Sequence, residues 1–202
     1  LRTPLTVLKG ELQVVLQDKK VTPEKYKTAI TSSLEEVDRL IALSTRLLRL
    51  SAGPASQSEE CVVKDVLHIT LSRLRPLLNK KHLSIKQHVI PIVVPMAEAD
   101  LVEVLSVIID NAIKYSSFGD VIELYAKVEN QKVEISIIDK GPGIAPQDMP
   151  HIFERFYRSK QAVDGGYGLG LALAQKLVVE AGGTIAVESR PGRTCFSVHL
   201  PG

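Results

Sequence analysis

The chain has 202 residues, of which 45% are hydrophobic and 24% are charged, and its formal net charge is +2. This length suffices for one large or two small globular domains, and the charge is too small to indicate a nucleic-acid or anionic-membrane partner. No apolar run approaches the roughly 18 residues of a membrane-spanning helix, and Cys61 and Cys195 fit no disulfide or metal-binding pattern, which favours a reducing compartment such as the cytoplasm.

Residues 1–52 have the apolar periodicity of two helices. The second helix is predicted to begin near Thr22, an N-cap residue type, with Pro23 at its first helical position. Its broad apolar stripe comprises Ile30, Leu34, Val37, Ile41 and Leu48 beside Leu40, Leu43, Leu47 and Leu50. Because two helices cannot cover so wide a stripe alone, we expect a homodimer that completes a four-helix bundle. The alternative is that the hairpin packs on the C-terminal part of its own chain.

A linker and a second domain follow the helices. Residues 53–58 have the Gly, Pro and Ser composition of a linker. In residues 59–202 we predict helices over 64–80, 98–116 and 168–181, and strands over 83–89, 120–129, 132–139, 184–189 and 194–200. The predicted fold is therefore α+β: a helical hairpin, then an α/β sandwich in which helices cover one face of a mixed sheet.

Polar side chains lie near the end of the helix predicted over 98–116. Asn111, Lys114 and Tyr115 share one helix face through spacings of three and four residues. An amide oxygen can coordinate Mg²⁺, an ammonium group can pair with phosphate, and a tyrosine ring can lie against a base. Alone, Asn111 fits a solvated polar residue better, but its neighbours favour the nucleotide interpretation.

The strand predicted over 132–139 ends in a carboxylate followed by two glycines, Gly141 and Gly143. An Asp that opens a turn is common, so Asp139 has an ordinary structural interpretation. The functional alternative is an acceptor for the exocyclic amine of adenine, with the glycines letting the backbone approach the ring.

A glycine-rich segment leads into the helix predicted over 168–181. Gly166, Gly168 and Gly170 precede Leu171, and such a helix start binds phosphate through free amides and the positive end of the helix dipole. The segment is neither a P-loop nor a Rossmann fingerprint, because Leu171 stands where the first requires Lys and the second Gly.

An aromatic and basic segment lies between the two glycine-rich segments. We expect Phe153 and Phe156 to dock on a pocket, so that the segment forms a lid that excludes water from a nucleotide. Arg155 and Arg158 are either surface charges or groups that stabilise charge during phosphate transfer.

In this order and spacing the motifs resemble those of the sensor histidine kinases of two-component signalling. Asn111 matches their N box, residues 139–143 the first glycine box, 153–158 the F box, and 166–171 the second glycine box. Residues 1–5, Leu-Arg-Thr-Pro-Leu, resemble the end of their H box. The resemblance implies a homodimeric histidine-phosphotransfer bundle followed by an ATP-binding catalytic domain of the Bergerat type.

The resemblance also assigns ligands and roles. ATP and Mg²⁺ are the implied ligands: Asn111 holds Mg²⁺, Lys114 and Arg158 contact phosphate, Tyr115 packs on adenine, and Asp139 binds the adenine amine. The remaining implied site residues are Gly141, Gly143, Phe153, Phe156, Gly166, Gly168, Gly170 and Leu171. Phosphate is implied to pass from ATP to a His and then to an Asp of a response-regulator receiver domain.

Two positions depart from the family pattern. Val107 stands where the family often has a second Asn, so the metal site would have one protein ligand fewer. The phospho-accepting His would lie before Leu1, so we expect a fragment whose membrane anchor, if any, is also upstream. Thr3 follows that His by one helical turn and could position a water for attack on the regulator's aspartyl phosphate, which implies phosphatase activity, unless Thr3 is only a surface residue.

Two other functions stay open at this point. Other Bergerat ATPases, such as gyrase B and the heat-shock chaperones, hydrolyse ATP with a Glu at the position of Val107, which cannot activate water. A degenerate kinase would only dimerise and dock a regulator, against which the intact glycine boxes argue. Nucleotide binding and phosphate trapped on His would separate these possibilities.

Overall fold

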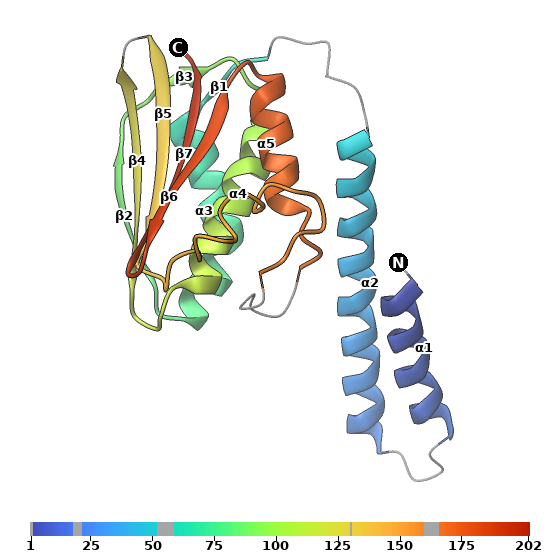
Figure 1. Cartoon of the computed structure of the whole chain (residues 1–202). Helices are drawn as coiled ribbons and strands as arrows, with labels where there is room; N and C mark the ends of the chain where they lie inside the picture. Colours follow the sequence, from blue (N-terminus) through green and yellow to red (C-terminus); the bar gives the residue numbers. More distant parts are fainter. Residues whose placement is uncertain (1, 18–21, 52–58, 130, 160–165) are drawn as a thin grey trace. The chain divides into compact units, whose positions relative to one another are not determined.

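The computed structural model of the chain describes residues 2–17, 22–51, 59–129, 131–159 and 166–202. Residues 1–52 and 53–202 form two compact units, and each is described by itself (Figure 1). Within the described ranges, none of the helices combines the length and the apolar character that crossing a membrane requires.

The first unit contains the two predicted helices, α1 (Arg2–Gln17) and α2 (Pro23–Ser51). Pro23 opens α2, as expected from its fixed backbone angle. The carbonyl of Thr22 accepts the Tyr26 N–H at 3.1 Å, and its Oγ1 accepts the Lys25 N–H in a longer contact of 3.4 Å. Thr22 therefore acts as the N-cap, as its residue type predicted.

One apolar row of α2 remains exposed in this unit. The side chains of the row predicted from the sequence are between 39% and 70% exposed: Ile30, Leu34, Val37, Ile41 and Leu48. The parallel row is half-buried or buried: Leu40, Leu43, Leu47 and Leu50. Apolar side chains repeating at helical spacing on a surface mark a contact face rather than scattered exposure.

The second unit is built on a five-stranded sheet with the strand order β2-β4-β5-β7-β6 (Figure 1). Its strands are β2 (Ser84–Val89), β4 (Val121–Glu129), β5 (Lys132–Asp139), β6 (Thr184–Arg190) and β7 (Arg193–Pro201). The pair β2–β4 is parallel and the other pairs are antiparallel, so the sheet is mixed. The predicted fold class is confirmed.

Three helices, α3 (Val63–Lys80), α4 (Glu98–Tyr115) and α5 (Gly170–Glu180), cover one face of this sheet (Figure 1). Buried positions alternate with mostly half-buried ones along β4 and β5, which turns one row of each strand toward the helices. The largest fully buried side chains of this layer include Leu101, Leu105 and Ile108 on α4 and Ile122, Leu124, Ile135 and Ile137 on the sheet. Burial of each such side chain contributes roughly 1.5–3 kcal/mol of stability. Because α4 packs against both α3 and α5, it is the central helix of the core.

A small antiparallel sheet of β1 (Cys61–Val62) and β3 (Val93–Val94) was not predicted. Each strand has two residues, which is too short for a period-two pattern, and Pro91 and Pro95 flank β3. The Val63 N–H donates to the Ile92 carbonyl at 2.9 Å and extends the ladder. The pairing ties the segment before α3 to the segment before α4.

Candidate functional site

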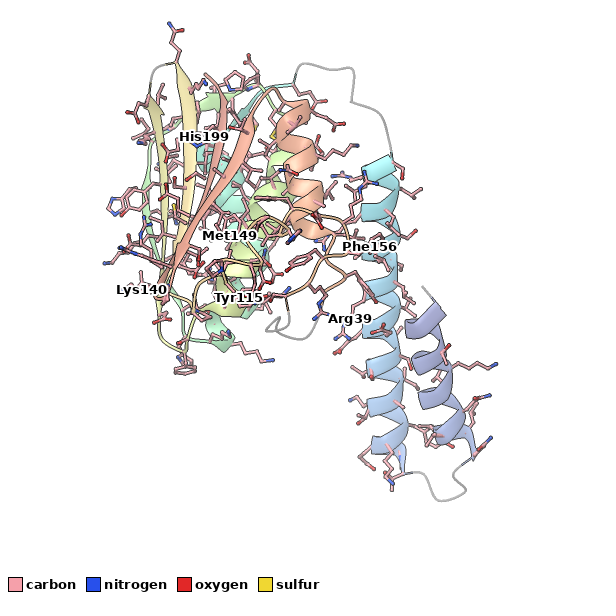
Figure 2. The ribbon with its side chains drawn as sticks, in the orientation of Figure 1. Arg39, Tyr115, Lys140, Met149, Phe156 and His199 are labelled. Atoms are coloured by element: carbon pink, nitrogen blue, oxygen red, sulfur yellow. The ribbon has the colours of Figure 1, made fainter. Side chains whose placement is uncertain are left out.

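The last turn of α4 carries the first set of predicted site residues. Asn111 and Lys114 are half-buried, and Tyr115, the final residue of the helix, is 36% exposed (Figure 2). The Nζ of Lys114 lies 2.5 Å from Oδ2 of Asp110, an ion pair across one helical turn. A phosphate group at this place would compete with Asp110 for the ammonium group.

Asp139 ends β5 and continues the row of that strand that faces the helices. Its side chain is buried, and its Oδ1 accepts the Gly141 N–H at 2.8 Å. No residue in the part of the chain that the structure describes donates a hydrogen bond to its Oδ2. Burial raises the pKa of Asp139 from 3.8 to about 6; the Gly141 hydrogen bond opposes this shift and nearby Asp120 adds to it. The carboxyl group is thus a weakly solvated acceptor with one oxygen left for a ligand.

Gly141 brings the turn after β5 against the end of α4. A Cβ at this position would lie 2.9 Å from the Tyr115 carbonyl oxygen and 2.8 Å from Oδ1 of Asp139, so a side chain cannot be accommodated. The Gly141 carbonyl accepts the Gly192 N–H at 3.0 Å, which holds the turn from its other side. The first two motifs therefore meet through the close approach of Gly141 and Tyr115.

The start of α5 approaches α4 in the same way. A Cβ at Gly170 would lie 3.1 Å from Cγ1 of Val107, which precedes Asn111 by one helical turn. Leu169 occupies the N-cap position of α5 and makes no side-chain capping hydrogen bond. The first amides of α5 and the positive end of its dipole therefore lie about one turn along α4 from Asn111.

All three motifs thus come together around α4. Figure 2 places Tyr115 and Lys140, the residue after Asp139, at the same end of the unit. This arrangement offers a buried carboxylate for a base, a tyrosine ring, and, for phosphates, the amides at the start of α5 and the lysine of the last turn of α4. The roles of the individual side chains stay predictions.

The aromatic segment packs on the second glycine-rich segment through its backbone. Phe156 has a φ of +67° and donates its N–H to the Gly168 carbonyl at 2.8 Å. A Cβ at Gly168 would lie 2.6 Å from the Phe156 carbonyl carbon. Phe153 is half-buried, whereas Phe156 is 62% exposed (Figure 2), so the expectation that both rings dock on a pocket is not met by Phe156. Its backbone makes the contact in place of its ring.

The remaining predicted residues are placed as follows. Gly166 is exposed with a φ of +150°, Gly143 has a φ of +86°, Leu171 is half-buried in the first turn of α5, and Arg158 is exposed at the end of the aromatic segment. Thr3 lies in α1, but its side chain falls outside what the structure describes. Its phosphatase role stays a prediction.

A pair of hydroxyl groups beside Asp139 was not predicted. Thr194 is buried and is paired with Asp139 across β5 and β7, and its Oγ1 lies 3.0 Å from Oγ of Ser189. The Ser189 Oγ accepts the Ile144 N–H at 2.8 Å, which braces the turn that follows Asp139. A polar residue in an otherwise apolar row of β7 is the only sequence signal for this pair, and it becomes informative only once the strand register is known.

Comparison with protein families matches residues 96–202 to "Histidine kinase-, DNA gyrase B-, and HSP90-like ATPase". The signal transduction histidine-protein kinase ArlS of Staphylococcus haemolyticus (strain JCSC1435) is 34% identical over 210 residues, which cover 98% of this chain and 46% of that protein. The chain therefore spans about half the length of the curated relatives it matches.

Solved structures of histidine kinases are similar to the chain over nearly its whole length. The Acinetobacter baumannii histidine kinase AdeS has a TM-score of 0.83 at 27% identity, covering 99% of this chain and 95% of that chain. Full-length ShkA, in complex with AMPPNP, has a TM-score of 0.75 at 26% identity, covering 97% and 43% respectively. These matches confirm the resemblance to sensor histidine kinases drawn from the sequence.

Proposed function

Since the chain belongs to the family of histidine kinase-, DNA gyrase B-, and HSP90-like ATPases, we propose that it is the kinase core of a two-component sensor histidine kinase. It binds ATP at α4 and transfers the γ-phosphate to a His of the longer protein, from which an Asp of a response-regulator receiver domain takes it. The observation that carries the proposal is the convergence of three nucleotide motifs on α4, through Tyr115–Gly141 and Val107–Gly170.

Each element supplies one kind of contact in this proposal. The free oxygen of Asp139 accepts the exocyclic amine of adenine, and the ring of Tyr115 lies against the base. The amides at the start of α5 and the Lys114 ammonium group bind the phosphates. The AMPPNP complex of ShkA supports an adenine nucleotide as the ligand.

Arg158 has a separate place in this proposal. It is exposed at the end of the aromatic segment, which packs on the glycines before α5. From there we assign it the stabilisation of charge on the transferred phosphoryl group.

We assign Mg²⁺ to Asn111. The ion neutralises charge on the phosphates and uses few protein ligands, because most of its coordination comes from water and phosphate oxygens. Asn111 fits this role through its amide oxygen and its place one turn from the Val107–Gly170 contact. Among the described residues there is no group of three or more His, Cys, Asp or Glu side chains that could hold a metal.

We assign homodimerisation to the exposed apolar row of α2. The five side chains of this row repeat over the central and C-terminal parts of the helix, from Ile30 to Leu48, and are each at least 39% exposed. The same row on a second copy of α2 would bury them in a four-helix bundle. Phosphatase activity, through Thr3, belongs to the proposal by family resemblance.

Calorimetric titration of the chain with ATP, with and without Mg²⁺, tests the proposal. We expect binding that strengthens with Mg²⁺ and that is lost in Gly170→Val, whose side chain would collide with Val107 at the start of α5. Gly10→Val on α1 is the matched control, because the space around Gly10 is open and no nucleotide motif lies there. A wild-type chain that shows no heat of binding with either ATP solution contradicts the proposal.

A further inference from the structure

Lys81, the residue after α3, reaches the C-terminal end of α4. Its Nζ donates hydrogen bonds to the carbonyl oxygens of Ile113, Lys114 and Ser116 at 2.9, 2.7 and 3.0 Å. An ammonium group has three N–H donors, so these contacts use its full capacity. Lys81 itself is half-buried.

These acceptors are groups that a helix end leaves without partners. The last carbonyls of a helix have no intrahelical donor and form the negative end of the helix dipole, where a cation is stabilising. The Ala112 carbonyl still accepts the Ser116 N–H at 3.0 Å, whereas the next two carbonyls, of Ile113 and Lys114, accept hydrogen bonds from Lys81. The main-chain carbonyl of Lys81 also accepts the Gly119 N–H at 3.0 Å, so both parts of the residue hold the connection after α4.

The same turn of α4 forms the nucleotide site. The carbonyl of Tyr115, between those of Lys114 and Ser116, is the group that Gly141 approaches. The direction of the Tyr115 and Lys114 side chains and the position of the Asp139 turn therefore depend on how this helix end is held.

We infer that Lys81 is a positioning residue for the ATP site: it touches no nucleotide but fixes the end of α4 against the turn that carries Asp139. The inference rests on the proposed function. It extends the site to the residue that follows α3, outside the nucleotide motifs.

The test compares four variants of the whole chain. Lys81→Met removes all three donors, and Lys81→Arg keeps the charge and several donors. Lys80→Met is the matched control, because Lys80 is an exposed lysine one position earlier. Val133→Ala, at the opposite end of β5 from Asp139, weakens the core without touching the site. Each is measured for thermal midpoint and, at a temperature at which it is fully folded, for the dissociation constant of ATP with Mg²⁺.

We expect Lys81→Met to weaken ATP binding about tenfold or more, as loss of hydrogen bonds from a charged donor predicts. Lys81→Arg should recover most of the affinity, and Lys80→Met should bind as the wild type does. Val133→Ala should lose thermal stability while its dissociation constant stays unchanged. Should Lys81→Met not fold, Lys81→Gln, which keeps a shorter amide donor, takes its place.

The inference is overturned if Lys81→Met binds ATP with wild-type affinity. It is also overturned if Val133→Ala, at an equal loss of thermal stability, loses as much ATP affinity as Lys81→Met does. A wild-type chain that does not bind ATP contradicts the proposed function instead. In that case amide hydrogen exchange still tests whether Lys81 holds the end of α4. Faster exchange over residues 113–120 in Lys81→Met supports this role, and unchanged exchange there refutes it.

Discussion

Replacement of Asp139 by Asn should change nucleotide affinity and folding stability in opposite directions. Asn keeps an oxygen that can accept the Gly141 N–H but presents an amide donor where the free carboxylate oxygen stood. The amide donor of the variant would then face the exocyclic amine of adenine, so that two buried donors would lie opposite each other without an acceptor. We expect ATP affinity to fall by roughly 1–3 kcal/mol, which is about 5- to 150-fold.

The effect on stability follows from the pKa of Asp139. Burial raises that pKa from 3.8 to about 6, and at about 1.4 kcal/mol per unit the ionised native form is disfavoured by about 3 kcal/mol relative to the unfolded chain. A raised native pKa contributes stability that is fully present below the unfolded value of 3.8 and is lost as the pH rises through about 6. Asp139→Asn, which cannot ionise, should therefore be more stable than the wild type above this window, and the difference should shrink toward about pH 4.

Urea unfolding of both proteins across this window measures the difference in free energy of unfolding, and titration with ATP measures the affinity. Asp38→Asn is the control, because Asp38 is an exposed carboxylate on α2, outside the ATP-binding unit. Wild-type ATP affinity in Asp139→Asn would exclude the adenine contact of Asp139. A stability difference that does not change with pH would exclude a raised pKa of Asp139.

Three further predictions concern Gly141, the exposed apolar row of α2, and Thr3. Gly141→Ala should lower both stability and ATP affinity, because its Cβ would lie 2.9 Å from the Tyr115 carbonyl oxygen; Gly10→Ala, where the space is open and φ is not positive, is the control. Residues 59–202 alone should be monomeric by light scattering, and Ile41→Glu in the whole chain should dissociate the homodimer. A dimer that persists without α1 and α2 would refute the assignment of homodimerisation to α2. In the longer protein, Thr3→Ala should keep autophosphorylation but slow dephosphorylation of the regulator, and an unchanged dephosphorylation rate would exclude that role.

Most of the fold followed from periodicity. In β5 the alternation of Val133, Ile135 and Ile137 with polar residues marks a strand with one buried face, and it predicted the observed bounds of Lys132–Asp139. The long helix α4 has enough turns for its apolar face to be unmistakable. The pair β1–β3 could not be predicted, because two residues carry no periodicity and their pairing is set by tertiary contacts.

The candidate site was predictable where glycine spacing and residue type carry the signal. Gly141 and Gly170 stand at the two close approaches to α4, which is why glycine is required there. Thr194 and Lys81 act through partners that are distant in sequence, so their roles depend on strand register and helix packing that no local pattern encodes. Phe156 was assigned to a pocket because aromatic rings are usually buried, but its backbone has a positive φ, which is uncommon for a residue other than glycine, and its ring is exposed.

The most direct test of the kinase assignment is phosphate transfer from ATP labelled at its γ-phosphate. The protein used should extend upstream through the segment that the resemblance identifies as the H box. We predict Mg²⁺-dependent labelling of a His upstream of Leu1, recognised by a phosphate that is stable in base and lost in acid, and movement of the label to a response regulator. Release of inorganic phosphate with no label on the protein at any time would contradict the account.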